Sequence, residues 1–163
     1  CANLPYNITT PVLTALIESG RFARITVMIQ REVARRICAA PGAQDYGAFS
    51  VYCQFHTVPE PLFDVGPECF VPAPKVTSSV LRLTPRAELP QGVTDEGRFF
   101  RVVRASFAQR RKTLLNALSA GLGGVDKGAI RAAIAACGLP ETIRGERLGI
   151  PEFAVLTAAL GPF

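Results

Sequence analysis

The chain has 163 residues, enough for one ordinary domain or two small ones, and its 48% of hydrophobic residues excludes a disordered chain. The formal net charge of +5 and the pI near 9.2 favour a polyanionic partner. The five cysteines are widely spaced without a C-x-x-C pair, which disfavours a disulfide framework or a zinc site, and no apolar run is long enough for a membrane span. We therefore expect a soluble cytoplasmic protein that has no metal and no contact with a membrane.

The first third of the chain alternates helical and strand-like segments. Thr10 as N-cap and Pro11 at the first position predict a helix that ends at Gly20. The apolar run "RITVMI" (24–29) predicts a buried strand, and "QREVARRICAA" (30–40) predicts a second helix. This alternation is typical of a parallel sheet that is covered by crossover helices.

The next segment, residues 47–56, has the composition of a strand, but its aromatic and polar side chains repeat on one helical face. We predict a helix there. Two strands follow, "TVPEPLFDV" (57–65) and "VTSSVLRL" (76–83), and the prolines of the first favour a place at the sheet edge.

A segment rich in proline, glycine and acidic residues, "TPRAELPQGVTDEG", then separates two parts of the chain. Beyond it, apolar residues recur at three- and four-residue spacings, which predicts helices only. We therefore expect an α/β unit over residues 1–84, a linker over 85–97 and a helical domain over 98–163.

The sequence "NLPY" directly precedes the first predicted helix and has a chemical interpretation. The N6 amine of adenine is a poor nucleophile, because its lone pair is delocalised into the ring. The side-chain oxygen of Asn3 and the carbonyl of Leu4 can accept its two hydrogens and turn the lone pair towards a methyl donor. Pro5 restricts the turn, and Tyr6 offers a face on which a flipped base can stack. The alternative is a strand that ends in a simple turn, with Tyr6 packed in the core.

A second aromatic residue lies in "CFVPAPKVTSSVLRL". Phe70 precedes Pro72, Pro74 and a strand, which together would hold its ring rigidly, as a base-stacking platform requires. Taken alone, Phe70 fits a core aromatic residue better than a functional one.

Six blocks of this sequence, in chain order, resemble the ribosomal RNA adenine N6,N6-dimethyltransferases of the KsgA type. The blocks are "NLPYNITTPVL", "MIQREVARRI", "DYGAFSV", "CFVPAPKVTSSVLRL", "FAQRRKTLLNAL" and "RGERLGIPEFAVL". The resemblance implies the C-terminal part of a Rossmann-like methyltransferase domain followed by a small all-helical domain. It also implies S-adenosylmethionine as the methyl donor. The implied substrate is two adjacent adenosines in a hairpin near the 3′ end of small-subunit rRNA, within the immature small ribosomal subunit.

The resemblance assigns roles to five residues. Asn3 matches the residue that holds the target amine and lies beside the methionine portion of the donor, and Leu4 and Pro5 complete its turn. Tyr6 and Phe70 match the two aromatic residues that sandwich the base.

The segment Arg98–Ala120 contains six positive residues and no acidic ones. Arg104, Arg110, Arg111 and Lys112 are our candidates for RNA phosphate contacts, because "QRRK" lies at a predicted helix junction where it can meet a backbone. The alternative is an ordinary solvated helix face.

One part of the family pattern does not occur in this sequence. The family places its donor pocket mainly on three earlier strands, with a Gly-rich loop after the first. The "GLGG" at residues 121–124 is no substitute, because it follows a predicted helix. We therefore expect the fragment to be inactive alone and to self-associate through its exposed sheet. Two alternatives stay open: a large-subunit adenine methyltransferase of the macrolide-resistance type, and a non-catalytic RNA-binding assembly factor.

Overall fold

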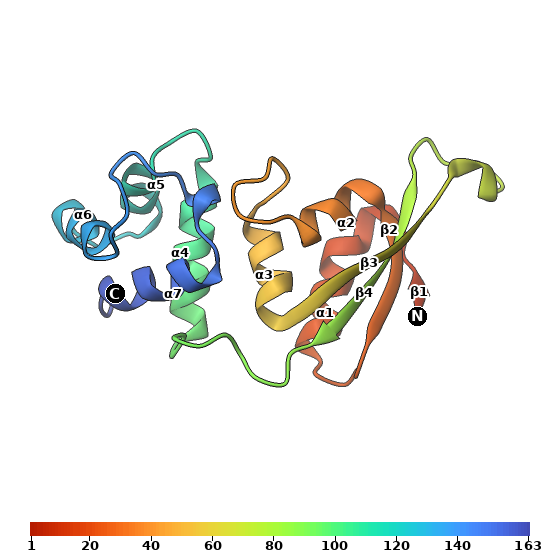
Figure 1. Ribbon diagram of the computed structural model, residues 1–163, viewed down its shortest axis with the longest axis horizontal. Coiled ribbons are helices and arrows are strands. Elements are labelled where there is room, and N and C mark those ends of the chain that lie inside the picture. Colours follow the sequence, from red (N-terminus) through yellow and green to blue (C-terminus); the bar gives the residue numbers. More distant parts are fainter. The chain divides into compact units, whose positions relative to one another are not determined.

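The computed structural model describes residues 1–163, and these form two compact units (Figure 1). The first unit comprises Cys1–Ala39 and Cys53–Glu88, and the second comprises Ala40–Tyr52 and Leu89–Phe163. One boundary falls inside the predicted linker. The segment Ala40–Tyr52, which we had assigned to the α/β unit, groups instead with the helical residues.

The first unit is built on a sheet of four strands in the order β1-β2-β4-β3. The strands are β1 Ala2–Asn3, β2 Ile25–Gln30, β3 Thr57–Val65 and β4 Ser78–Pro85. Only β1 and β2 are parallel, whereas β4 runs antiparallel to both β2 and β3. The prediction of a parallel sheet is therefore wrong for β3 and β4. They are neighbours in the chain and pair as the two arms of a hairpin, which forces opposite directions. The predicted edge position of β3 is confirmed.

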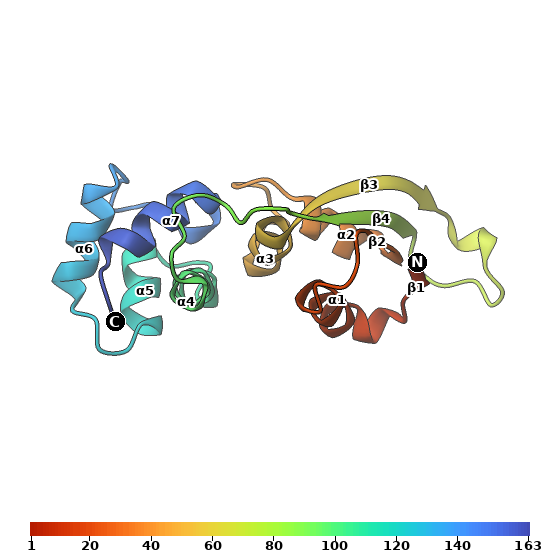
Figure 2. The same ribbon diagram turned by 90° about the horizontal axis from the view of Figure 1, so that it is seen from below.

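Two α-helices and two short 3-10 helices belong to the first unit: η1 Tyr6–Ile8, α1 Thr9–Glu18, α2 Arg31–Cys38 and η2 Pro67–Cys69. Figure 2 shows α1 on one face of the sheet. The prediction of Thr10 as N-cap is wrong, since Ile8 holds that position and makes no side-chain cap bond. The Ile8 amide donates to the Pro5 carbonyl at 3.2 Å, so that η1 leads straight into α1 without a separate cap.

The core of the first unit lies between the sheet and its helices. Alternate side chains of β2 and β4 are buried, as a half-buried strand requires. The largest wholly buried aliphatic residues of this core are Leu13, Ile29, Ile37, Leu81 and Leu83. The prediction of a helix over residues 47–56 is confirmed by α3, Ala48–His56.

The second unit contains four further α-helices: α4 Glu96–Ala108, α5 Leu114–Gly121, α6 Lys127–Ala136 and α7 Ile150–Ala159. A short 3-10 helix, η3 Gly145–Arg147, precedes α7. Helix α4 packs against α5 and α7, and α6 packs against the same two helices. Phe99 and Phe153 are wholly buried and meet edge to face, with ring centroids 6.4 Å apart. No helix of the protein is both long and apolar enough to cross a membrane.

The segment 40–47 is fixed to the rest of the second unit by hydrogen bonds to backbone carbonyls. The buried hydroxyl of Tyr46 donates to the Leu148 carbonyl at 2.9 Å, and the Gly42 amide donates to the Glu146 carbonyl at 2.7 Å. Burial, and then the charge of Glu152, raise the pKa of the Tyr46 hydroxyl, which therefore stays a donor.

Candidate functional site

The "NLPY" turn lies where β1 ends and is held from both sides. The Leu4 amide donates to the Met28 carbonyl of β2 at 3.1 Å, which continues the pairing of β1 by one residue. The Pro5 carbonyl accepts from the Ile8 amide and, at 3.3 Å, from the Thr9 hydroxyl at the start of α1. The turn is therefore fixed to the sheet at one end and to a helix at the other.

A cavity of about 280 Å³ opens beside this turn, within the first unit. All five predicted site residues line it, with Asn3, Leu4, Pro5 and Tyr6 contributed by the turn and Phe70 by the loop between β3 and β4. Pro72 and Pro74 complete the lining. The volume is at the lower end of the range for ligand pockets, about 300 Å³, and suits one planar heterocycle. Residues 67 positions apart in the sequence thus form one site.

The loop that carries Phe70 is anchored at both of its ends. At the end of β3, the Asp64 carboxylate accepts a hydrogen bond from the Ser79 hydroxyl and lies 3.7 Å from the Arg31 guanidinium. At the start of β4, the Thr77 carbonyl accepts from the Arg31 amide at 3.0 Å. Arg31, the first residue of α2, therefore contacts both ends of the loop.

Within the loop, the Phe70 amide donates to the Pro67 carbonyl at 3.2 Å and closes the turn of η2. The Phe70 side chain is half-buried, and the neighbouring Val71 is wholly exposed. Besides the prolines, on which the predicted rigidity of the ring rests, the contacts at the loop ends restrain this loop.

Sequence reasoning missed one residue that contacts the site from behind its lining. The hydroxyl of Ser78 lies 2.7 Å from the hydroxyl of Tyr6, and Ser78 is wholly buried. The only signal in the sequence is the pair of adjacent serines at the start of an otherwise apolar strand.

The cavity lining contains an amide, backbone carbonyls, two aromatic rings and prolines, but no carboxylate, histidine or lysine. Such a site can orient a flat base and accept hydrogen bonds from its amine. It offers no strong general base. No group of three or more histidine, cysteine or acidic side chains is placed to hold a metal ion.

The basic side chains of the segment Arg98–Ala120 are of two kinds: some contact other groups of the protein, which we call engaged, and others do not, which we call free. Arg98 and Arg101 lie over the ring of Phe163, with their guanidinium carbons 5.0 and 5.1 Å from its centroid. Arg110 donates to the carbonyls of Gln44 at 2.9 Å and Tyr46 at 3.0 Å. These three arginines therefore have structural partners.

The three other basic side chains of the segment are exposed and make no ion pair or side-chain hydrogen bond: Arg104, Arg111 and Lys112. Arg111 and Lys112, together with the engaged Arg110, line a cavity of about 340 Å³ in the junction between α4 and α5. Of the four predicted phosphate-binding residues, these three keep free charges, whereas Arg110 is engaged.

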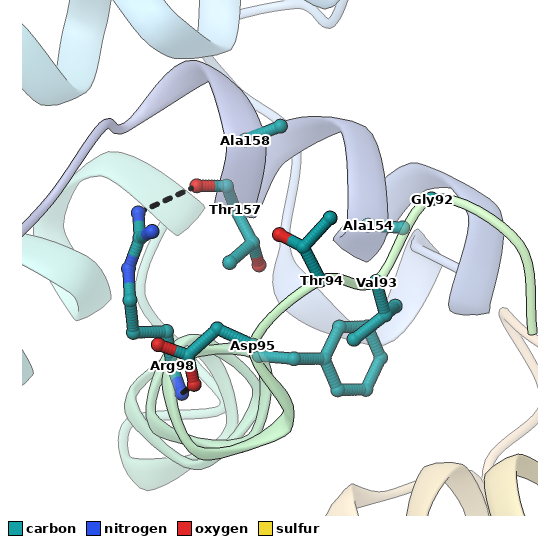
Figure 3. Close-up of a pocket in the computed structure, with 9 residues that line it drawn as sticks. Gly92, Val93, Thr94, Asp95, Arg98, Ala154, Thr157 and Ala158 are labelled. Carbon is teal, nitrogen blue, oxygen red and sulfur yellow. Dashed lines mark hydrogen bonds between the residues drawn. The ribbon is translucent and has the colours of Figure 1, made fainter. Parts of the chain in front are cut away.

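Another cavity of the second unit is a packing defect and not a ligand site. It lies between residues 92–95, the start of α4 and helix α7, as Figure 3 shows. Arg98 runs along it and donates to the carbonyls of Thr157 at 3.3 Å and of Gly161. Its volume of about 20 Å³ holds a single water molecule at most.

Comparison with solved structures defines the fold class. A dimethyladenosine transferase from Plasmodium falciparum superposes with a TM-score of 0.75 over 96% of this chain and 64% of that one, at 22% identity. The 23S rRNA methyltransferase ErmE superposes with a TM-score of 0.68 over 99% of this chain and 64% of that one, at 23% identity. The fold is therefore that of the Rossmann-like rRNA methyltransferases.

The sequence narrows the class to a family. The family model of ribosomal RNA adenine dimethylases matches residues 1–135, and the chain belongs to this family. Ribosomal RNA small subunit methyltransferase A of Shouchella clausii is 50% identical over 98% of this chain and 54% of its own length. The protein of that name from Geobacter sulfurreducens is 48% identical over 98% of this chain and 58% of its own length. The chain thus spans about half the length of the curated relatives it matches.

Proposed function

We propose that this chain provides the base-binding half of a methyltransferase that methylates adenine N6 twice. Its substrate would be two adjacent adenosines in a hairpin near the 3′ end of small-subunit rRNA, presented by the immature small ribosomal subunit in the cytoplasm. One observation carries the proposal: the "NLPY" turn and Phe70, far apart in sequence, line one cavity large enough for a base. Family membership supports the same reading.

In this proposal each lining residue has a separate task. The Asn3 side-chain oxygen and the Leu4 carbonyl accept the two hydrogens of the amine and aim its lone pair away from the ring. Tyr6 and Phe70 stack on the two faces of the base, which has left the RNA stack. The amine needs no strong base, since the methylated product is acidic enough to lose its proton to solvent.

S-adenosylmethionine fits the site at one point. Asn3 ends β1, and ligands of open α/β sheets bind outside the carboxyl ends of the strands. Asn3 would hold the methionine portion of the donor, which supplies an electrophilic methyl group when bound. The contacts to its adenosine portion would come from residues beyond 1–163.

RNA affinity would come from the free cations of the second unit. Arg104, Arg111 and Lys112 have no protein partner, and a phosphate backbone supplies one. Arg110 supports them indirectly, because it holds segment 40–47.

The test is transfer of a labelled methyl group to a hairpin RNA with two adjacent adenosines, by a protein of the relatives' full length that contains these residues. Asn3→Ala should lower turnover at least ~100-fold, as loss of one preorganised electrostatic partner does, with RNA affinity unchanged. Asn116→Ala, on the exposed surface of α5, serves as the matched control. Near-normal dimethylation by Asn3→Ala would contradict the proposal, as would a wild-type protein that binds this RNA without methylating it. Preference for a large-subunit hairpin would support the macrolide-resistance alternative.

A further inference from the structure

We propose that Ser78 is a positioning residue for the target base: its hydroxyl holds the hydroxyl of Tyr6 and so sets the direction of the Tyr6 ring in the cavity. The inference rests on the proposed function and adds to it a residue that does not line the cavity.

The contact joins a short turn outside the sheet to a central strand of the sheet. Tyr6 opens the single turn η1, outside the sheet, whereas Ser78 begins β4, which pairs with β2 on one side and β3 on the other. Ser78 lies in register with Gln30 and with Val65. The two hydroxyl oxygens are 2.7 Å apart, a normal hydrogen bond between residues 72 positions apart.

The position of the bond on the tyrosine ring matters for stacking. The hydroxyl lies at the end of the ring farthest from the backbone, so a partner there fixes the long axis of the ring. A tyrosine without that partner can move about both of its side-chain torsions. If the Tyr6 ring is displaced, the base that stacks on it is displaced too. A displacement of about 1 Å at a reacting centre can lower the rate ~100-fold.

Ser78 also ends the loop that carries Phe70. The preceding carbonyl, that of Thr77, accepts from the Arg31 amide, and the following residue, Ser79, bonds to Asp64. The same point of the chain therefore anchors the Phe70 loop and holds Tyr6. The start of β4 thus holds Tyr6 through the Ser78 hydroxyl and the Phe70 loop through the neighbouring Thr77 and Ser79.

A purely structural role would have a different consequence. If the bond served only to satisfy a buried hydroxyl, its loss would lower the stability of the first unit and leave the rate of the folded protein unchanged. Thr57→Val provides the matched control, because Thr57 is a wholly buried hydroxyl of the same sheet, bonded to the Cys53 carbonyl at 2.7 Å and at the far end of β3 from the Phe70 loop.

The experiment is a double-mutant cycle of Tyr6→Phe and Ser78→Ala in the protein of full length. Each variant and the pair should lower kcat by about 10-fold or more, and the double variant should be no slower than the slower single one. The Tm of each should change no more than that of Thr57→Val, whose kcat should stay at the wild-type value. Tyr6→Phe keeps the ring and all buried packing, so it gives a result even if Ser78→Ala fails to fold.

The fluorescence of a base analogue distinguishes an effect on the position of the Tyr6 ring from an effect on RNA binding. With 2-aminopurine in place of a target adenosine, the wild-type protein should quench the stacked base, and both single variants should quench it less at saturating RNA. Two results would overturn the role of Ser78 while leaving the proposed function intact. One is a Tyr6→Phe variant with the kcat and the quenching of the wild-type protein, and the other is a double variant in which the kcat losses of the two single variants multiply. No methylation by the wild-type protein would overturn this inference together with the proposed function.

Discussion

The salt dependence of RNA binding should separate the free cations from the engaged one. We expect Arg104→Gln, Arg111→Gln and Lys112→Gln, combined, to flatten the plot of log affinity against log salt concentration. Each phosphate contact contributes about 0.7–0.9 to that slope, so three lost contacts should reduce it by about 2–3. Between about 50 and 200 mM salt, the wild-type chain should therefore lose about 20–40-fold more affinity than the triple variant.

The matched comparison is Arg110→Gln, which removes the same charge from the same junction. The Arg110 guanidinium donates hydrogen bonds to two backbone carbonyls and lies 3.9 Å from the Glu146 carboxylate. Its loss should lower the free energy of unfolding by about 1 kcal/mol, because it is half-exposed and its bonds are partly replaced by water. The salt slope should change little.

Fluorescence anisotropy with a labelled hairpin RNA, titrated with residues 1–163 at four salt concentrations, measures the slopes. Thermal unfolding of the same samples measures stability. The reasoning is refuted if the triple variant keeps the wild-type slope, or if Arg110→Gln flattens it as much as Arg111→Gln does.

Four further predictions concern stability and thiol reactivity. Gly121→Ala should destabilise the second unit by about 1–3 kcal/mol in denaturant titrations, because its Cβ would lie 2.6 Å from that of Ala105, whereas Gly123→Ala meets no atom within 4 Å and should be tolerated. Tyr46→Phe should cost about 1–2 kcal/mol, since it leaves a buried carbonyl without its donor; an unchanged Tm would contradict this. Burial raises the pKa of Cys53 to about 12, so its thiol should react with a disulfide reagent only on unfolding, unlike the two exposed cysteines. Because Cys53 keeps its proton in the folded protein while the unfolded chain ionises, its contribution should make stability fall as pH rises from about 9 towards 12, which pH-dependent denaturation can measure.

The sequence indicated two local elements that the structure brings together. The Asn-Leu-Pro-Tyr order indicated a turn, the prolines after Phe70 indicated a restrained loop, and residues of both line one cavity. The Tyr6–Ser78 hydrogen bond could not be predicted from the sequence, because a serine at the start of a strand has many possible partners. Only the pairing of β4 in the sheet selects one of them.

In the fold too, local features could be predicted from the sequence, whereas features set by long-range pairing could not. Helix α3 could be recognised from its side-chain periodicity despite a strand-like composition. The direction of β4 depends on its hairpin pairing with β3, and periodicity carries no information on strand direction. The engagement of Arg110 was hidden for a similar reason, since its acceptors are main-chain carbonyls of a segment 64 and 66 residues away.

The two-segment composition of the second unit has a consequence for exchanging parts between family members. A helical domain transplanted from a relative by a single junction near residue 89 would leave the host's segment 40–52 to pack against foreign helices. Hydrogen bonds to the backbone carbonyls of Glu146 and Leu148 hold this segment. Its aromatic rings hold it too, since Tyr46 meets Phe107 and Tyr52 meets Phe100 of α4, with ring centroids 5.7 and 5.6 Å apart. Such a hybrid should therefore keep its stability only where the aromatic residues of the segment match those of the transplanted α4.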